Sequence, residues 1–323
     1  MIIVTGAAGF IGRHVALRLL DQGEEVVGVD DFTPYYDPAL KEARARELEA
    51  RPGFRMERLD VADADAFAAL VRRSGARRIV HLAAQAGVRY SLENPFAYEH
   101  ANVAGHLSVL EACRHAPGFE HLVYASSSSV YGDRPAGGAG GFCEDETLPE
   151  PASLYAATKR ADELMSATYA RLYGLRQTGL RFFTVYGPWG RPDMAYFIFT
   201  QKILAGEPID VFGEGRMSRD FTYVDDIVDG LIGALDRPPA AAENRILNIG
   251  GDRPVELLRM IEVLEGALGR KAEKILKPMQ PGDVTATWAD VRKLKALTGY
   301  APKVRIEEGL PRFVDWYRRF YGA

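Results

Sequence analysis

Cysteine and histidine are scarce in this chain of 323 residues. It contains only two cysteines, Cys113 and Cys143, and six histidines. Two cysteines are too few for a disulfide framework, which indicates a reducing cytoplasm. The histidines lack H-x-x-x-H spacing and have no cysteines nearby, so we expect no metal site.

The chain also lacks long apolar runs and long runs of like charge. No apolar stretch reaches the length of a membrane-spanning helix, and the first expected strand begins at the start of the chain, which leaves no room for a signal peptide. The net charge is −4, and pairs such as Arg77-Arg78 and Arg318-Arg319 are isolated. We therefore expect neither a membrane nor a nucleic-acid partner.

A strand followed by a glycine-rich turn is expected at the first residues of the sequence. The apolar run 2–4 is typical of a buried parallel strand, and it leads into Gly6, Gly9 and Gly12, followed by apolar residues at helical spacing. Gly6 permits a tight turn, Gly9 the approach of a pyrophosphate, and Gly12 the packing of helix on strand. Glycines alone would also suit an ordinary α/β turn. The residues expected to hold the cofactor here are Gly6, Ala8, Gly9, Phe10, Ile11 and Gly12.

A second feature favours a dinucleotide. The next expected strand, 25–30, ends in Asp30, and Asp31 follows it. A carboxylate at this place accepts hydrogen bonds from the 2′-hydroxyl of an adenine ribose and repels a 2′-phosphate. The predicted cofactor is therefore NAD rather than NADP.

Two later stretches extend this cofactor site. The expected strand 54–61 ends near Asp60, a plausible adenine neighbour, and small residues follow the expected strand 78–83. Small side chains let a cofactor lie over the strand ends, although tight helix-sheet packing would also explain them. The residues assigned to the cofactor here are Asp60, Val61, Leu82, Ala83, Ala84 and Ala86.

Strands alternate with helices up to residue 183, which predicts a doubly wound parallel sheet, the Rossmann α/β fold. We expect an NAD-binding domain from residues 1–183 and about 221–252. Residues 184–220 and 253–323 should form a smaller α/β lobe over the carboxyl ends of the strands, where ligands bind in such folds.

Tyr155 and Lys159 stand four residues apart in an expected helix, 153–173, and so share one face. The serine run 126–129 ends the strand before it. A tyrosine has a pKa of about 10 in water, so the charges of Lys159 and of oxidised nicotinamide are needed to stabilise a phenolate. We predict Tyr155 as general base and acid, with Ser127 on the same substrate oxygen. Alternatively, Tyr155 is a packed aromatic and Lys159 a solvated charge.

These motifs resemble the nucleotide-sugar epimerase and dehydratase group of the extended short-chain dehydrogenase/reductase family. Within the group, the chain is most similar to the enzymes that act on C4 of UDP-glucuronate. The resemblance covers nearly the whole chain and rests on the stretches 30–37, 84–91, 126–132, 181–192, 219–225 and 280–283.

The serine run distinguishes reactions within this group. Sugar-nucleotide 4,6-dehydratases carry Asp-Glu where this chain has Ser128 and Ser129, and UDP-glucuronate decarboxylases carry Glu at the position of Ser129. Both chemistries need an extra acid or base after oxidation at C4. The resemblance therefore implies NAD-dependent C4 epimerisation of UDP-glucuronate to UDP-galacturonate through a 4-keto intermediate.

The resemblance also implies contacts to the nucleotide. Arg219 and Arg191 are candidates for the diphosphate, although either could be a structural ion pair. Galactose epimerases have Arg where this chain has Gln280, so one usual phosphate contact is missing, and Arg191 could replace it. The remaining assignments are Asn102 to the cofactor, Asp283 to the uridine ribose, and Val211 and Phe212 to the surroundings of uracil.

Thr184 stands where galactose epimerases place Asn. With Ser127, Ser128 and Arg89 it could bind the C6 carboxylate, because hydroxyls and a guanidinium suit an anion. Arg89 could instead face phosphate or solvent.

Two other functions stay open for the same sequence. One is a 4-epimerase of neutral sugars such as UDP-glucose or UDP-N-acetylglucosamine, and the other is a non-catalytic NAD-sensing regulator. The intact Ser127, Tyr155 and Lys159 argue against the regulator. The family further implies a homodimer through helices 95–115 and 153–173, whose lengths allow a four-helix contact.

Overall fold

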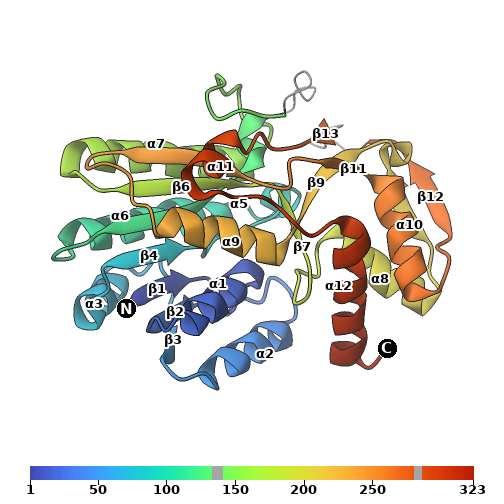
Figure 1. The fold of residues 1–323 in the computed structure, drawn as a ribbon, viewed down its shortest axis with the longest axis horizontal. Helices are drawn as coiled ribbons and strands as arrows, with labels where there is room; N and C mark the ends of the chain where they lie inside the picture. Colours follow the sequence, from blue (N-terminus) through green and yellow to red (C-terminus); the bar gives the residue numbers. More distant parts are fainter. Residues whose placement is uncertain (133–140, 280–285) are drawn as a thin grey trace.

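The structure, a computed structural model, describes residues 1–132, 141–279 and 286–323. Its centre is a parallel sheet in the order β10-β6-β5-β4-β1-β2-β3, which confirms the predicted doubly wound fold (Figure 1). The strands are β1 (Ile2–Thr5), β2 (Val26–Asp30), β3 (Phe54–Arg58), β4 (Arg78–His81), β5 (His121–Ser127), β6 (Gln177–Phe182) and β10 (Asn244–Ile249).

Helices cover both faces of this sheet. One face carries α1 (Phe10–Asp21), α2 (Pro38–Glu49), α9 (Val224–Leu235) and α11 (Arg292–Thr298), and the other carries α3 (Ala64–Ser74), α6 (Gly105–His115) and α7 (Leu154–Tyr173). Alternate residues of β1 belong to different cores, Ile2 to the cluster of Val15 and Ile3 to the cluster of Val109. A strand buried on both faces is apolar throughout, as the run 2–4 predicted.

The expected helix 95–115 differs from the prediction. It begins as predicted, because Pro95 is its first residue and the Asn94 side chain accepts from the Ala97 N–H at 3.4 Å. The chain then passes through α5 (Pro95–Tyr98) and a π-helical turn, η1 (Glu99–Ala104), before α6, with the short α4 (Tyr90–Glu93) ahead of them. Wide turns of this kind are frequent at functional sites.

The smaller lobe lies beside the carboxyl ends of the large sheet and ends with the C-terminal helix (Figure 1). Within it, β9 pairs with β7, β11 and β13, while β8 pairs with β12. Its elements are η2 (Ser128–Tyr131) at the border, β7 (Thr184–Tyr186), α8 (Ala195–Ala205), β8 (Ile209–Phe212), η3 (Gly213–Gly215), β9 (Ser218–Tyr223), β11 (Pro254–Glu256), α10 (Leu257–Leu268), β12 (Lys274–Lys277), β13 (Ala286–Thr287) and α12 (Ile306–Tyr321).

This topology moves one expected boundary. Strand β9 belongs to the smaller sheet, so the chain returns to the large domain at α9, three residues after the expected position 221. In the described part of the chain no helix is long and apolar enough to cross a membrane. Gln280, Asp283 and most of the glycine-rich segment 137–141 lie outside the described residues.

Candidate active site

A cleft runs over the carboxyl ends of β1, β2, β4, β5 and β6, where the sequence predicted the ligands. It brings together most of the expected cofactor residues and four of the residues expected to catalyse the reaction or bind the substrate. The predicted residues that line it are Gly6, Gly9, Phe10, Ile11, Gly12, Asp30, Asp31, Asp60, Val61, Leu82, Ala83, Ala84, Ala86, Ser127, Tyr155, Lys159 and Arg191.

The glycine turn fits a pyrophosphate. Gly6 has a φ of +68°, and a Cβ there would lie 2.8 Å from the backbone nitrogen of Ala83. A Cβ on Gly12 would lie 2.0 Å from the carbonyl oxygen of Gly6, so helix α1 packs directly on the turn. The first N–H groups of α1 therefore border the cleft, where they offer donors and the positive end of the helix dipole to phosphates.

Asp30 stands at the far end of this turn and is 5% exposed. Its Oδ2 accepts from the Ala8 N–H at 3.0 Å and its Oδ1 from the Phe32 N–H at 2.9 Å. Burial raises the pKa of Asp30, and Lys41, whose Nζ lies 3.6 Å from Oδ1, opposes that effect. The carboxylate is fixed at the cleft wall, as a ribose-binding acid requires. Ala8 itself is fully buried, so it serves the turn through its backbone.

Asp60 and Asn102 have different surroundings. Asp60 lines the cleft, and its Oδ2 lies 2.7 Å from Nε2 of His100. Asn102 is not part of the lining, because its side chain is used inside the protein. Its Oδ1 accepts from the Gln85 N–H at 2.8 Å, while its Nδ2 donates to the Gln85 carbonyl at 3.1 Å and to Thr158 Oγ1 at 3.0 Å. Asn102 therefore supports the end of β4, and its contact with the cofactor stays a prediction.

Tyr155 and Lys159 share the cleft-facing side of α7. The helix begins after Ser153, whose Oγ accepts from the Ala156 N–H at 3.1 Å. Lys159 is 3% exposed, and its Nζ donates to the carbonyl of Ala125 at 3.1 Å. The side chain is thus held by the end of β5, the strand that carries Ser127. This excludes the alternative of a solvated lysine.

Ser127 is oriented by its own strand end. Its Oγ accepts from the Ser129 N–H at 3.1 Å and donates to Ser129 Oγ, also at 3.1 Å. The hydroxyl lines the cleft beside Tyr155 and Lys159. A phenol, an ammonium group and a hydroxyl therefore line one cleft, at the end where the nicotinamide is expected.

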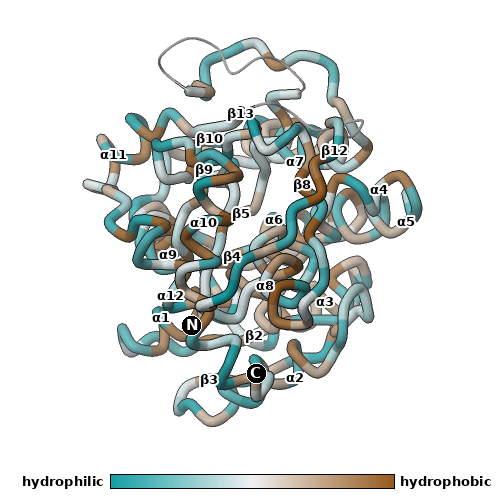
Figure 2. Tube along the Cα trace, turned by 90° about the vertical axis from the view of Figure 1, so that its right-hand side faces the viewer, coloured by the Kyte–Doolittle hydropathy of each residue, from teal (hydrophilic) through white to brown (hydrophobic). Residues whose placement is uncertain are grey.

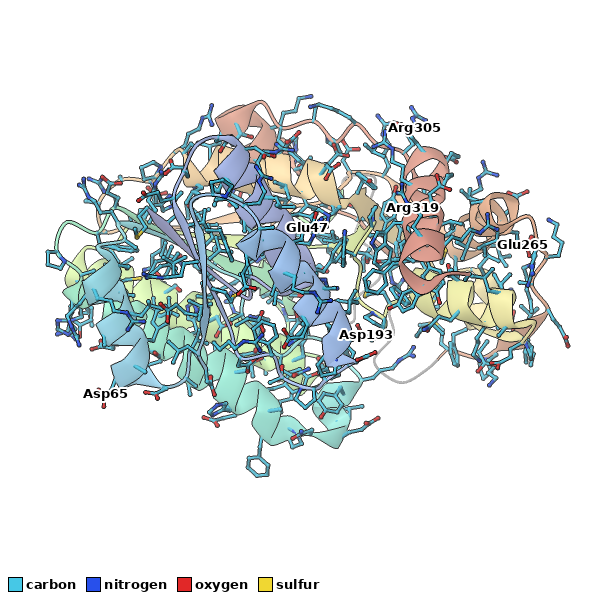
Figure 3. All side chains as sticks on the ribbon, turned by 90° about the horizontal axis from the view of Figure 1, so that it is seen from below. Glu47, Asp65, Asp193, Glu265, Arg305 and Arg319 are labelled. Atoms are coloured by element: carbon cyan, nitrogen blue, oxygen red, sulfur yellow. The ribbon has the colours of Figure 1, made fainter. Side chains whose placement is uncertain are left out.

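Arg191 forms the structural ion pair that was considered for it, and its contact with the diphosphate stays a prediction. Its side chain lines the cleft. It also forms a bidentate ion pair with Asp193, in which Nε donates to Oδ1 at 3.0 Å and Nη2 donates to Oδ2 at 2.5 Å. Tyr35 donates to the same carboxylate at 3.2 Å. Asp193 lies at the junction between the large domain and the lobe (Figure 3). The guanidinium is thereby held in place at the mouth of the cleft.

Among the described residues, the other side chains predicted to bind the substrate lie outside the cleft lining. The guanidinium carbon of Arg89 lies 5.3 Å from the ring centre of Phe212, and Lys277 Nζ lies 5.9 Å from it. This geometry favours the nucleotide side for Arg89 over the C6 carboxylate. Val211 is fully buried, so its side chain offers no surface to uracil. Arg219 Nη1 donates to the carbonyl of Ser218 at 2.9 Å.

Thr184 and Ser128 flank the site without lining it. Thr184 opens β7 and pairs with Phe221 of β9, and Ser128 opens η2. Both are partly exposed. They stand on two of the segments that leave the carboxyl ends of the large sheet, Thr184 after β6 and Ser128 after β5.

Two charged neighbours of predicted residues were missed. Lys41 pairs with Asp30, and Asp162 pairs with Lys159 at 3.0 Å. For Asp162 a signal existed, since an acid three residues after a lysine shares its helix face. For Lys41 none existed, because its contact depends on how α2 folds back over β2. Among the described residues, no group of three or more His, Cys, Asp or Glu side chains could hold a metal ion.

Comparison with known proteins adds the following similarities. The model of the NAD dependent epimerase/dehydratase family matches residues 2–250. A Rhizobium meliloti protein named probable UDP-glucuronate 4-epimerase is 48% identical over 336 residues, covering 99% of this chain and 97% of that protein. UDP-glucuronate 4-epimerase 1 of Arabidopsis thaliana is 47% identical over 335 residues, covering 99% and 77%. The crystal structure of UDP-glucuronic acid 4-epimerase from Bacillus cereus with UDP-glucuronic acid and NAD matches with a TM-score of 0.91 and 36% identity over 99% of both chains.

Proposed function

Because the chain belongs to the NAD-dependent epimerase/dehydratase family, we propose that it inverts C4 of UDP-glucuronate to give UDP-galacturonate through a 4-keto sugar. The observation that carries this proposal is the meeting of Ser127, Tyr155 and Lys159 in one cleft with the glycine turn. The similar proteins named as UDP-glucuronate 4-epimerases support the substrate.

The cofactor is NAD, and this cleft has the groups to hold it. The turn amides would bind the pyrophosphate, Asp30 the adenine ribose, and Lys159 the ribose next to the nicotinamide. The chemistry that bound NAD supplies is removal of the C4 hydrogen with its electron pair and its later return. We assign these contacts as part of the proposal.

The chain's own residues handle the proton and the geometry. Tyr155, as phenolate, accepts the proton of the O4 hydroxyl while the C4–H bond breaks, so that C4 and O4 become a carbonyl. Ser127 donates a hydrogen bond to O4 and Lys159 stabilises the phenolate. After the keto sugar turns its other face to the cofactor, Tyr155 returns the proton to O4 and the epimer is complete.

We assign the nucleotide to the lobe side of the cleft. Phe212 has Arg89 and Lys277 within reach of its ring, so one aromatic surface for uracil stands beside two cations for the diphosphate. Arg191 adds a third cation at the cleft mouth. We retain Thr184, Ser128 and Ser127 as the proposed carboxylate contacts, and the two-part domain division that separates cofactor from sugar.

A panel of UDP-sugars followed by NMR tests the function. Incubation with UDP-glucuronate should give UDP-galacturonate without added reductant, because the cofactor is regenerated in each cycle. Faster turnover of UDP-glucose or UDP-N-acetylglucosamine would favour the neutral-sugar enzyme instead. No turnover of any UDP-sugar by protein that contains NAD would favour the non-catalytic regulator.

We also propose a homodimer, as the resemblance implies, and a cytoplasmic location, as the low cysteine count indicates. Large apolar side chains are exposed on the two expected interface helices, Leu107 on α6 and Leu164, Leu172 and Tyr173 on α7. The neighbouring α4 and α5 include hydrophobic positions, brown in Figure 2. Light scattering at micromolar concentration should give a dimer mass, and Leu164→Arg should give a folded monomer. A wild-type monomer would contradict the proposal.

A further inference from the structure

The buried neighbour of Lys159 has no role in the mechanism above. Asp162 is 1% exposed and lies one helical turn after Lys159 on α7. Its Oδ2 accepts from Lys159 Nζ at 3.0 Å. Its Oδ1 is also buried, and within the described residues it accepts no hydrogen bond. Within the ranges that the structure describes, Lys159 is thus the one side chain that donates a hydrogen bond to this carboxylate.

We propose that Asp162 is a positioning residue that sets how strongly the charge of Lys159 acts on Tyr155, and so sets the lower edge of the enzyme's working pH range. The inference rests on the proposed function, in which Tyr155 is the base. A carboxylate 3.0 Å from the ammonium offsets much of its charge at longer range.

The groups packed around Asp162 add little uncompensated charge to the pair of Asp162 and Lys159. On α7, Glu163 is bound by Arg181, with Nε to Oε1 at 2.7 Å and Nη2 to Oε2 at 2.8 Å, so its charge is compensated. From β5, burial raises the pKa of Tyr124, which keeps the phenol neutral.

Two histidines approach the pair from the other side. Burial and the Lys159 charge lower the pKa of His81 on β4 to about 3, and burial lowers the pKa of His106 on α6 well below its ordinary value. Both are neutral at working pH. One ring nitrogen of each is in a side-chain hydrogen bond, since His81 Nδ1 lies 2.7 Å from Thr5 Oγ1 and His106 Nε2 lies 2.8 Å from Ser166 Oγ. His106 also forms a hydrogen bond with the backbone of Asp162.

The sign of the effect follows from this arrangement. An ionised Asp162 opposes the phenolate, because it adds negative charge nearby and offsets the lysine. Burial raises the pKa of Asp162 to about 6, even though Lys159 lowers it. The carboxylate is therefore ionised at neutral pH. Removing its charge should favour the phenolate and extend activity to lower pH.

The first test is Asp162→Asn, whose amide oxygen can still accept from Lys159. We expect the acid limb of the pH profile of kcat/KM to move about one unit to lower pH. Asp162→Ala removes the anchor as well, so it should show the same shift together with a reduced kcat. Because two variants carry the same expectation, a folding failure of one leaves the other decisive.

The second readout does not depend on turnover. The ultraviolet difference spectrum between each protein and its Tyr155→Phe counterpart reports the tyrosinate, and its titration should shift in the same direction. Asp226→Asn is the matched control. Asp226 is a buried helix carboxylate on α9 whose Oδ2 accepts from the Lys303 and Val304 N–H groups at 3.0 and 2.9 Å. Its pH profile should equal that of the wild type.

Unshifted profiles and spectra in both Asp162 variants would overturn the inference. That result would make Asp162 a structural partner of Lys159 only. Wild-type protein that epimerises no UDP-sugar would instead overturn the proposed function, while the tyrosinate spectra would still decide the role of Asp162.

Discussion

Replacing Gly12 by alanine should weaken the binding of NAD. An added Cβ would lie 2.0 Å from the carbonyl oxygen of Gly6, 2.7 Å from its carbonyl carbon and 3.0 Å from the Cα of Ala7. All three atoms are backbone, so no change of side-chain rotamer relieves the clash. Helix α1 must therefore move away from the turn, and its N-terminal donors move with it.

The expected loss follows from this displacement. Overpacking a fitted site costs about 1–3 kcal/mol and occasionally more. If most of the strain falls on the turn, NAD binding weakens by about tenfold for every 1.4 kcal/mol. We therefore expect affinity for NAD to drop by about ten- to a hundredfold, with a Tm lowered by about 2–4 °C per kcal/mol.

The matched control replaces a glycine at which an added Cβ would meet no other atom. Gly266 lies within α10, is exposed, and an added Cβ would meet nothing within 4 Å. Gly266→Ala should bind NAD as the wild type does. Its free energy of unfolding should rise by about 0.5–1 kcal/mol, because alanine suits a helix better than glycine. NAD affinity is measured by calorimetry on stripped protein and Tm by scanning calorimetry. A Gly12→Ala variant with wild-type affinity and Tm would refute the reasoning.

Three further predictions concern the chemistry. Tyr155→Phe should lower turnover by about 10²–10⁴-fold while NAD stays bound, since the ring is kept and the proton acceptor is lost; a variant with about a tenth of wild-type activity would contradict the assignment. Extracts of the purified, denatured protein should contain NAD, because Asp30 repels a 2′-phosphate, and finding NADP would contradict this. UDP-galacturonate should be the main product, and Thr184→Val should raise the share of UDP-pentose with NAD binding unchanged, because the 4-keto intermediate is a β-keto acid that loses CO₂ when its carboxylate is not held. Mostly UDP-xylose from the wild type would overturn this.

Local patterns and sheet rules were enough to predict the cofactor side. The glycine turn, Asp30 and the serine run each follow a strand, and the carboxyl ends of parallel strands meet at one edge of a sheet. Tyr155 and Lys159 needed only the helical repeat. These residues could therefore be assembled without knowing how distant segments pack.

Contacts between distant segments could not be predicted in this way. Arg89 and Phe212 lie on separate parts of the chain, and only the fold of the lobe brings them within 5.3 Å. The π-helical turn η1 has no sequence signal of its own, and Asn102 within it forms hydrogen bonds with Gln85 and Thr158. The strands β7, β11, β12 and β13 contain two to four residues, too few for a pattern of alternation.

The position that the resemblance links to the choice between related reactions lies one hydrogen bond from Ser127, the hydroxyl proposed to bind O4. Ser127 Oγ contacts both the N–H and the Oγ of Ser129 at 3.1 Å. The resemblance gives decarboxylases a glutamate at position 129, which would place an ionisable group at this strand end, beside the oxidised sugar. A serine there offers a hydroxyl that orients Ser127 and neither takes nor gives a proton at working pH. We therefore expect the side chain at 129 to help decide which reaction follows oxidation at C4, whereas the resemblance implies that the glycine turn, Tyr155 and Lys159 serve the oxidation itself.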